Sequence, residues 1–140
     1  MLNTYFETRA CIDRLLRQYK DHPRLIIAID FDDTIFDINF SGKPSQTILN
    51  IIKRCQKHNF YITIYTAREA KDFFFIAEYM SLQGIIIDSI NANPIPLQHG
   101  NSGKMYYNLL LDDKAGLGQA YLILDTLLAQ LEINNYVNKS

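Results

Sequence analysis

The stretch RLIIAIDFDDTIF, from Arg24 to Phe36, decides the fold that we expect for this chain. Its apolar residues 25–29 follow one another without alternation, which is typical of a strand buried on both faces of a parallel sheet. Three carboxylates, Asp30, Asp32 and Asp33, come directly after this run. Because like charges crowded at the end of a core strand repel one another, we expect a bound cation there.

The composition is that of a single globular domain, which we expect to cover residues 1–140. With 48% hydrophobic residues and a formal net charge of -1, the overall charge indicates no nucleic-acid-binding surface. The first residues are too polar for a signal peptide, and no apolar run approaches the roughly 18 residues of a membrane span. Cys11 and Cys55 lie in apolar helical patterns, which favours free thiols. We therefore predict a cytoplasmic protein without membrane contact.

Helical patterns occupy four parts of the chain. The predicted helices cover residues 1–22, 44–58, 69–83 and about 117–131. Thr4 and Glu7 are expected to form the capping box of the first helix, and Gly84 to end the third. The residues expected to face inward from the third helix are Phe73, Phe74, Ala77 and Met80. Residues 134–140 are expected to form a frayed tail.

Strand patterns alternate with these helices. The predicted strands cover residues 25–29, 60–65, 85–88 and 108–111, and the Asn-rich, Pro-rich and Gly-rich residues 91–103 are expected to form a loop. This alternation predicts an α/β fold with a parallel sheet covered on both faces. In such folds the binding crevice lies beyond the carboxyl ends of the strands.

Polar side chains follow three of the predicted strands. They are Asp30 and Asp32 after the first strand, Thr66 after the second, and Asp112 and Asp113 after the fourth, with Lys104 shortly before the fourth. Each close carboxylate pair would repel by about 4 kcal/mol at an effective dielectric constant near 20, so the site needs a cation. Oxygen ligands and room for a phosphate favour Mg²⁺.

A magnesium site of this kind allows nucleophilic chemistry. With Mg²⁺ and Lys104 neutralising the phosphoryl oxygens, one carboxylate can attack phosphorus. A second carboxylate two residues away can give a proton to the leaving oxygen and later take one from water.

The motifs resemble those of the haloacid dehalogenase-like superfamily of phosphohydrolases. DFDDT at residues 30–34 is similar to the family's DxDxT, and the other three motifs follow in the family's order: Thr66 in YITIYTAR, Lys104 in SGKMYY, and the pair Asp112 and Asp113 in NLLLDDKAG. Asp33 stands where the family usually has Gly, and we interpret it as a turn-shaping residue. The resemblance implies a Rossmann-like three-layer domain with strand order 3-2-1-4.

The resemblance also implies a role for each matching residue. Asp30 would be the nucleophile that becomes an aspartyl phosphate, and Asp32 the general acid and base. Thr66 and Lys104 would bind the phosphoryl oxygens. The Mg²⁺ ligands would be Asp30, the backbone carbonyl of Asp32, Asp112 and, through water or the lysine, Asp113. The second Asp indicates phosphate hydrolysis, since the dehalogenases lack it.

The gaps between the motifs hold no obvious cap domain, so the resemblance is to small capless members with an open site. We expect either a large phosphorylated partner or a neighbouring subunit to cover it. Residues that could contact the substrate are Arg68, Asn91 and Asn93.

Three other functions use residues of the same kinds, and two of them do not fit this sequence. GNSGKM, residues 100–105, is not a phosphate-binding loop, because Gln98 stands at its first Gly position and Met105 where Ser or Thr would bind the metal. A two-component receiver domain carries its acidic pair after the first strand, whereas here the pair comes last. A non-catalytic module that keeps the fold and binds phosphate stays open as the alternative.

Overall fold

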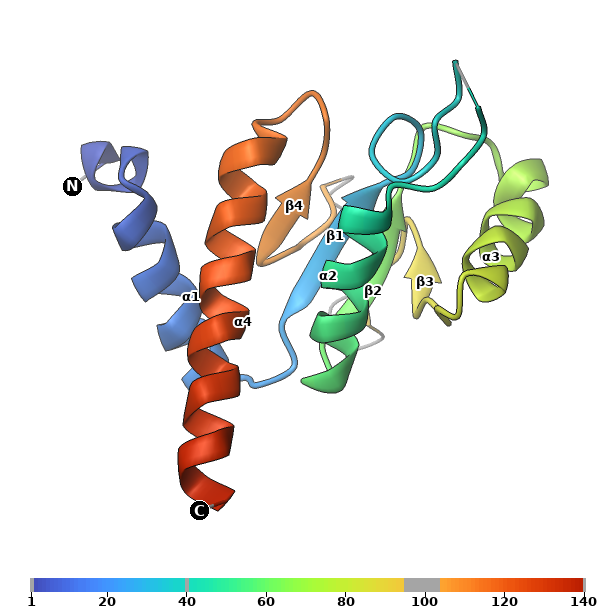
Figure 1. Ribbon diagram of the computed structural model, residues 1–140. Helices are drawn as coiled ribbons and strands as arrows, with labels where there is room; N and C mark the ends of the chain where they lie inside the picture. Colours follow the sequence, from blue (N-terminus) through green and yellow to red (C-terminus); the bar gives the residue numbers. More distant parts are fainter. Residues whose placement is uncertain (1, 40, 95–103, 140) are drawn as a thin grey trace.

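The computed structural model describes residues 2–39, 41–94 and 104–139, and its centre is a four-stranded parallel sheet (Figure 1). The strands are β1 (Ile26–Asp30), β2 (Tyr61–Tyr65), β3 (Ser89–Ile90) and β4 (Leu109–Leu111). They lie in the order β3-β2-β1-β4, and every pair is parallel. The predicted α/β class and strand order are therefore confirmed.

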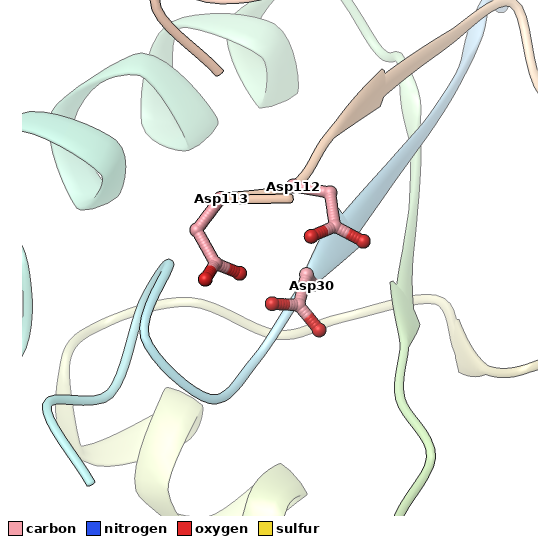
Figure 2. A group of neighbouring side chains, drawn as sticks. All are labelled: Asp30, Asp112 and Asp113. Carbon is pink, nitrogen blue, oxygen red and sulfur yellow. The ribbon is translucent and has the colours of Figure 1, made fainter. Parts of the chain in front are cut away.

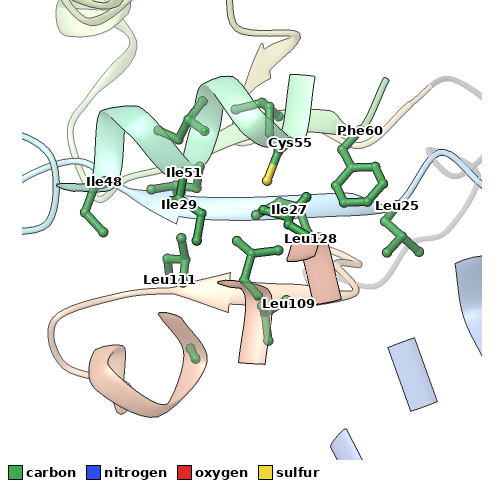
Figure 3. Close-up of a cluster of buried hydrophobic side chains, with 14 of the residues drawn as sticks. Leu25, Ile27, Ile29, Ile48, Ile51, Cys55, Phe60, Leu109, Leu111 and Leu128 are labelled. Carbon is green, nitrogen blue, oxygen red and sulfur yellow. The ribbon is translucent and has the colours of Figure 1, made fainter. Parts of the chain in front are cut away.

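Strand β1 is the central strand, because it pairs with β2 on one side and β4 on the other. Ile27 lies opposite Ile62 of β2 and Leu109 of β4. Ile27 and Ile29 are fully buried and, together with Leu111, face the residues of two helices, α2 (Gln46–Lys57) and α4 (Leu117–Lys139) (Figure 3). This apolar layer holds the carboxyl end of β1 in place.

Helix α2 begins at a side-chain cap. Ser45 Oγ accepts a hydrogen bond from the amide of Ile48 at 3.3 Å. The helix therefore begins at Gln46, two residues after Pro44, where we predicted its start. Its buried face includes Ile51 and Cys55. On its exposed side, Arg54 forms ion pairs with two acids of α4, namely Asp125 and Glu132.

The N-terminal helix, α1 (Thr8–Asp21), packs against α4 and buries Ile12 and Leu15. It is preceded by a 3-10 turn, η1 (Leu2–Phe6). The predicted capping box is wrong: Glu7 itself occupies the N-cap position, and its amide donates to the carbonyl of Thr4 at 3.1 Å. Thr4 lies within η1, where its side chain cannot cap α1.

The third predicted helix is divided into a 3-10 turn, η2 (Ala70–Asp72), and α3 (Phe73–Leu82). Ile76 and Met80 are buried, but the predicted inward orientation of Phe74 and Ala77 is wrong, since both are exposed. The apolar residues surround this helix, so the pattern does not define its inner face. Gly84, with φ +83°, follows the helix as predicted.

Strand β3 is shorter and later than predicted. The amide of Ile62 on β2 bonds to the carboxylate of Asp88 at 2.8 Å instead of to a strand carbonyl, so residues 85–88 stay outside the ladder. Asp88 also forms an ion pair with Arg24 at 3.0 Å.

The predicted frayed tail at 134–140 is wrong for residues 134–139, because α4 continues to Lys139. Leu131 is the last buried residue described in this helix, and the next five side chains are exposed. A helix already nucleated adds one hydrogen bond for each further residue, so it can extend past its packed part.

The motif linkers contain no additional domain within the described residues. After β1, residues 35–39 and 41–43 form a short flap, and the hydroxyl of Tyr79 on α3 donates to the carbonyl of Gly42 at 3.1 Å. Both cysteines are free, as predicted. In the part of the chain that the structure describes, no helix combines the length and apolar character that crossing a membrane requires.

Substitution of the core isoleucine Ile51 by Ala is expected to lower the free energy of unfolding by about 3 kcal/mol, because it leaves a cavity between α2 and the sheet. Ile86→Ala is the matched control: this side chain is 74% exposed, so its loss should cost less than about 0.5 kcal/mol. Urea denaturation followed by circular dichroism measures both. Equal effects of the two substitutions would contradict the described core.

Candidate active site

A tight turn after β1 sets the direction of the first acidic motif. The amides of Ile35 and Phe36 both donate to the carbonyl oxygen of Phe31 at 2.9 Å. Asp33 lies inside this turn with φ +65°, a conformation that Gly adopts freely and Asp tolerates. This backbone agrees with the turn-shaping role that we predicted for Asp33.

Three carboxylates from two strands meet beside this turn. One oxygen from each of Asp30, Asp112 and Asp113 lies within 4.8 Å of the others. Asp30 ends β1, and the two other acids follow β4, the neighbouring parallel strand (Figure 2). Residues about eighty positions apart in the sequence are thus brought to one edge of the sheet.

Thr34, the last residue of DFDDT, links the two strands. Its hydroxyl lies 3.1 Å from Asp30 Oδ2 and 3.3 Å from Asp113 Oδ1, and it accepts a hydrogen bond from the amide of Asp113 at 3.0 Å. One hydroxyl proton can serve only one of these carboxylates at a time. Sequence reasoning gave Thr34 no role, although its fixed place in the motif was a signal.

The crowding of the acids changes their proton affinity. Burial, the hydrogen bond with Asp113 and the charge of Asp112 raise the pKa of Asp30 to about 7. Burial acts in the same direction on Asp113, but hydrogen bonds from its neighbours outweigh it and lower the pKa of that carboxyl. In the absence of a cation, Asp30 therefore holds a proton below about pH 7, and it shares this proton with Asp113.

The donor set fits a divalent cation. All three groups offer carboxylate oxygens, the ligands that Mg²⁺ prefers, and the charges of Asp112 and Asp113 add to burial in raising the pKa of Asp30. The carboxylate of Asp32 is not part of this group.

Asp32 instead forms a two-pronged ion pair with Arg68. Arg68 Nε and Nη2 donate to the two carboxylate oxygens at 2.9 and 2.7 Å. The hydrogen bonds with Asp32 raise the pKa of Arg68, so the guanidinium stays charged. The structure thus brings Asp32, the predicted general acid and base, into contact with Arg68, which we expected to contact the substrate.

Thr66 is held at the end of β2 by a side-chain clamp. Asn91 accepts from the amide of Thr66 and donates to its carbonyl, both at 2.8 Å. The Thr66 hydroxyl accepts from the amide of Arg68 at 3.1 Å. Asn91 therefore uses its amide group to place Thr66, which differs from the substrate contact that we expected.

A pocket of about 450 Å³ joins these residues. Its lining contains Asp30, Asp32, Asp33, Tyr65, Thr66, Ala67, Asp112, Asp113 and Lys114.

Four predicted site residues lie outside this lining, namely Asn91, described above, and Asn93, Lys104 and Arg68. Asn93 is buried, and its amide group pairs with the backbone of Tyr106 at 2.6 and 2.9 Å, so it does not face the pocket. Lys104 is exposed on the stretch before β4. Arg68 is not part of the lining and donates to the carboxylate of Asp32. Lys114, which we did not single out, is the lysine of the lining.

Comparison with known families agrees with this geometry. Residues 27–117 match the model of the haloacid dehalogenase-like hydrolases, which covers more than half of the chain. The chain belongs to this family. The matched range includes both strand ends that carry the acidic cluster, so the cluster lies within the hydrolase fold itself.

A solved structure resembles this hydrolase over most of its length. It is described as the conserved protein coded by a locus from Bacteroides thetaiotaomicron, and the two share 21% sequence identity with a TM-score of 0.62. The similarity covers 73% of this chain and 90% of the other, and at this identity it supports the fold alone. No curated protein matches the hydrolase significantly.

Replacement of Asp30 by Asn should stabilise the metal-free hydrolase at pH 8. The folded wild type holds this proton up to about pH 7, whereas the unfolded chain loses it near the ordinary pKa of 3.8, so wild-type stability falls as the pH rises between these values. After allowance for solvent screening of a partly exposed group, we expect Asp30→Asn to be more stable by about 2 kcal/mol at pH 8 and equal below pH 4.

Urea denaturation at both pH values measures this difference. Added Mg²⁺ should stabilise the wild type more than Asp30→Asn, because the variant lacks one ligand. Equal unfolding free energies at pH 8 would contradict the raised pKa of Asp30 in the folded protein.

Proposed function

We propose that this hydrolase cleaves phosphate monoesters with the help of Mg²⁺ and with Asp30 as its nucleophile. The observation that supports this most is the meeting of Asp30, Asp112 and Asp113 within 4.8 Å. Such a donor set suits a hard divalent cation. Family membership supports hydrolysis as the reaction class.

The oxygens that would hold the ion are the carboxylates of Asp30, Asp112 and Asp113, together with the backbone carbonyl of Asp32 that the family resemblance implies. Bound there, Mg²⁺ supplies positive charge that offsets the carboxylates and the phosphoryl oxygens. Since Asp30 holds a proton below about pH 7 in the metal-free protein, metal binding at such pH must release this proton before Asp30 can act as a nucleophile.

The proposed reaction has two halves. In the first, a carboxylate oxygen of Asp30 forms a bond to phosphorus while the bond from phosphorus to the leaving oxygen breaks, and Asp32 gives that oxygen a proton. In the second, Asp32 takes a proton from a water molecule that attacks the aspartyl phosphate. This step releases inorganic phosphate and restores Asp30.

Other residues of the pocket would bind the phosphoryl oxygens. Thr66 lines the pocket, and we propose its hydroxyl as one donor. Lys114 is a cation of the pocket wall. We keep Lys104 as a proposed phosphate ligand on the order of the motifs alone, because it lies outside the lining.

The surroundings of the site are also part of the proposal. With only a short flap beside the pocket, we propose that a large phosphorylated partner or a neighbouring subunit covers it. Two free cysteines agree with a reducing compartment, and we propose the cytoplasm.

The wild type is expected to hydrolyse p-nitrophenyl phosphate with Mg²⁺ and to lose this activity with chelator. Asp30→Asn should lower kcat on the order of a thousandfold or more, because it removes the nucleophile. Release of nitrophenol at 405 nm measures the rate, since the product is coloured.

Asp13→Asn serves as the control for this experiment. Asp13 forms an exposed ion pair with Arg9 on α1, and its loss should leave kcat unchanged. If activity is insensitive to chelator, or survives in Asp30→Asn, the proposed mechanism is wrong. If the pure wild type binds phosphate without turnover, the non-catalytic module is the better description. The position of Lys104 outside the pocket lining is the observation that favours this alternative.

A further inference from the structure

We propose that Arg68 is a positioning residue for Asp32 and not a substrate ligand. The two-pronged ion pair would hold the Asp32 carboxylate in the orientation that activates water against the aspartyl phosphate. This inference rests on the proposed function, and it gives Arg68 a role in the second half of the proposed reaction, the hydrolysis of the aspartyl phosphate.

The first support is the placement of the two residues. Asp32 lines the acidic pocket, whereas Arg68 does not, and two nitrogens of the guanidinium donate to the two oxygens of the Asp32 carboxylate. Both side chains are mostly buried, with 22% exposure for Arg68 and 27% for Asp32. Because each carboxylate oxygen has a second lone pair, Asp32 can still accept a proton while Arg68 holds it.

The second support is the aromatic housing of the guanidinium. Arg68 Cζ lies 5.3 Å from the ring centre of Phe31, 5.7 Å from that of Phe36 and 5.5 Å from that of Phe75. At these distances each ring attracts the cation. The rings come from the turn after β1, the flap and α3, so three separate segments restrain one side chain.

The third support is the set of contacts that hold the backbone of Arg68 and the rings around its side chain. The amide of Arg68 donates to the hydroxyl of Thr66, so the loop after β2 fixes the start of the Arg68 side chain. Tyr79 contacts the rings of Phe31 and Phe36 and ties the flap to α3 through its bond to the Gly42 carbonyl. A side chain restrained from so many directions is suited to hold a neighbour still.

Steady-state kinetics with p-nitrophenyl phosphate distinguish positioning from substrate binding. Nitrophenol leaves without needing a proton, so the first half of the reaction depends little on Asp32, whereas the second half needs Asp32 as a base. We expect Arg68→Gln to lower kcat about tenfold and KM in proportion, with kcat/KM within about twofold of wild type. An initial burst of nitrophenol equal to the enzyme concentration should accompany this change.

Two further variants sharpen the experiment. Arg68→Lys keeps the charge but lacks the two-pronged geometry, so it should not restore kcat. In the Asp32→Asn background, Arg68→Gln should have no further effect on kcat, because the group that it positions is already gone.

Matched controls use the same chemistry away from the site. Arg24 pairs with Asp88 and lies 5.2 Å from the ring centre of Tyr61, so Arg24→Gln breaks a similar arrangement and should leave kcat and KM unchanged. Phe75→Leu removes one ring of the housing and should lower kcat, whereas Phe74→Leu, next to it and 78% exposed, should not.

The outcomes separate the two proposals. If the wild type turns over but Arg68→Gln raises KM and lowers kcat/KM, equally in the Asp32→Asn background, Arg68 binds substrate and this inference alone is wrong. The same holds if Arg68→Lys restores kcat. If the wild type does not hydrolyse the ester, the proposed function is wrong, and the inference is wrong with it.

Discussion

The pairing of β1 with β4 forces negative charges together that would separate in any less constrained arrangement. Both strands run in the same direction and are buried, so Asp30 and the pair Asp112 and Asp113 must leave the sheet at the same edge. The apolar layer beneath them is rigid and close-packed, so the backbone cannot relax to spread the acids. The core thus provides the energy that keeps the site crowded, and a cation is the natural counterpart of that crowding.

Much of the fold could be predicted because its signals are local. Unbroken apolar runs indicated the three longer strands to within one or two residues, and Gly84 indicated the end of α3. The errors arose where tertiary contacts override local patterns. α3 is apolar on all sides, so its inner face depends on its neighbours, and the length of β3 depends on a carboxylate, Asp88, that takes the place of a strand carbonyl.

The candidate site could be predicted only in part, for a similar reason. Residues at strand ends converge by the rule of parallel sheets, so the acidic cluster follows from the sequence. The partners of polar side chains within loops do not. Asn91 clamps the Thr66 backbone, Asn93 clamps that of Tyr106, and Arg68 reaches Asp32, and no spacing in the sequence distinguishes such contacts from contacts with substrate. Thr34 was overlooked because a hydroxyl that organises two carboxylates is not itself a reactive group.

The length of α4 has a practical consequence. This helix begins a few residues after Asp112 and Asp113 and runs for 23 residues, so it is about 34 Å long. Tyr136, in the last part of α4, is 77% exposed. Figure 1 shows the C-terminal end of this helix extending past the other elements. A fluorescent label attached there would report the rotational diffusion of the whole molecule without disturbing the acidic edge, and this makes α4 a suitable handle for detecting a large partner.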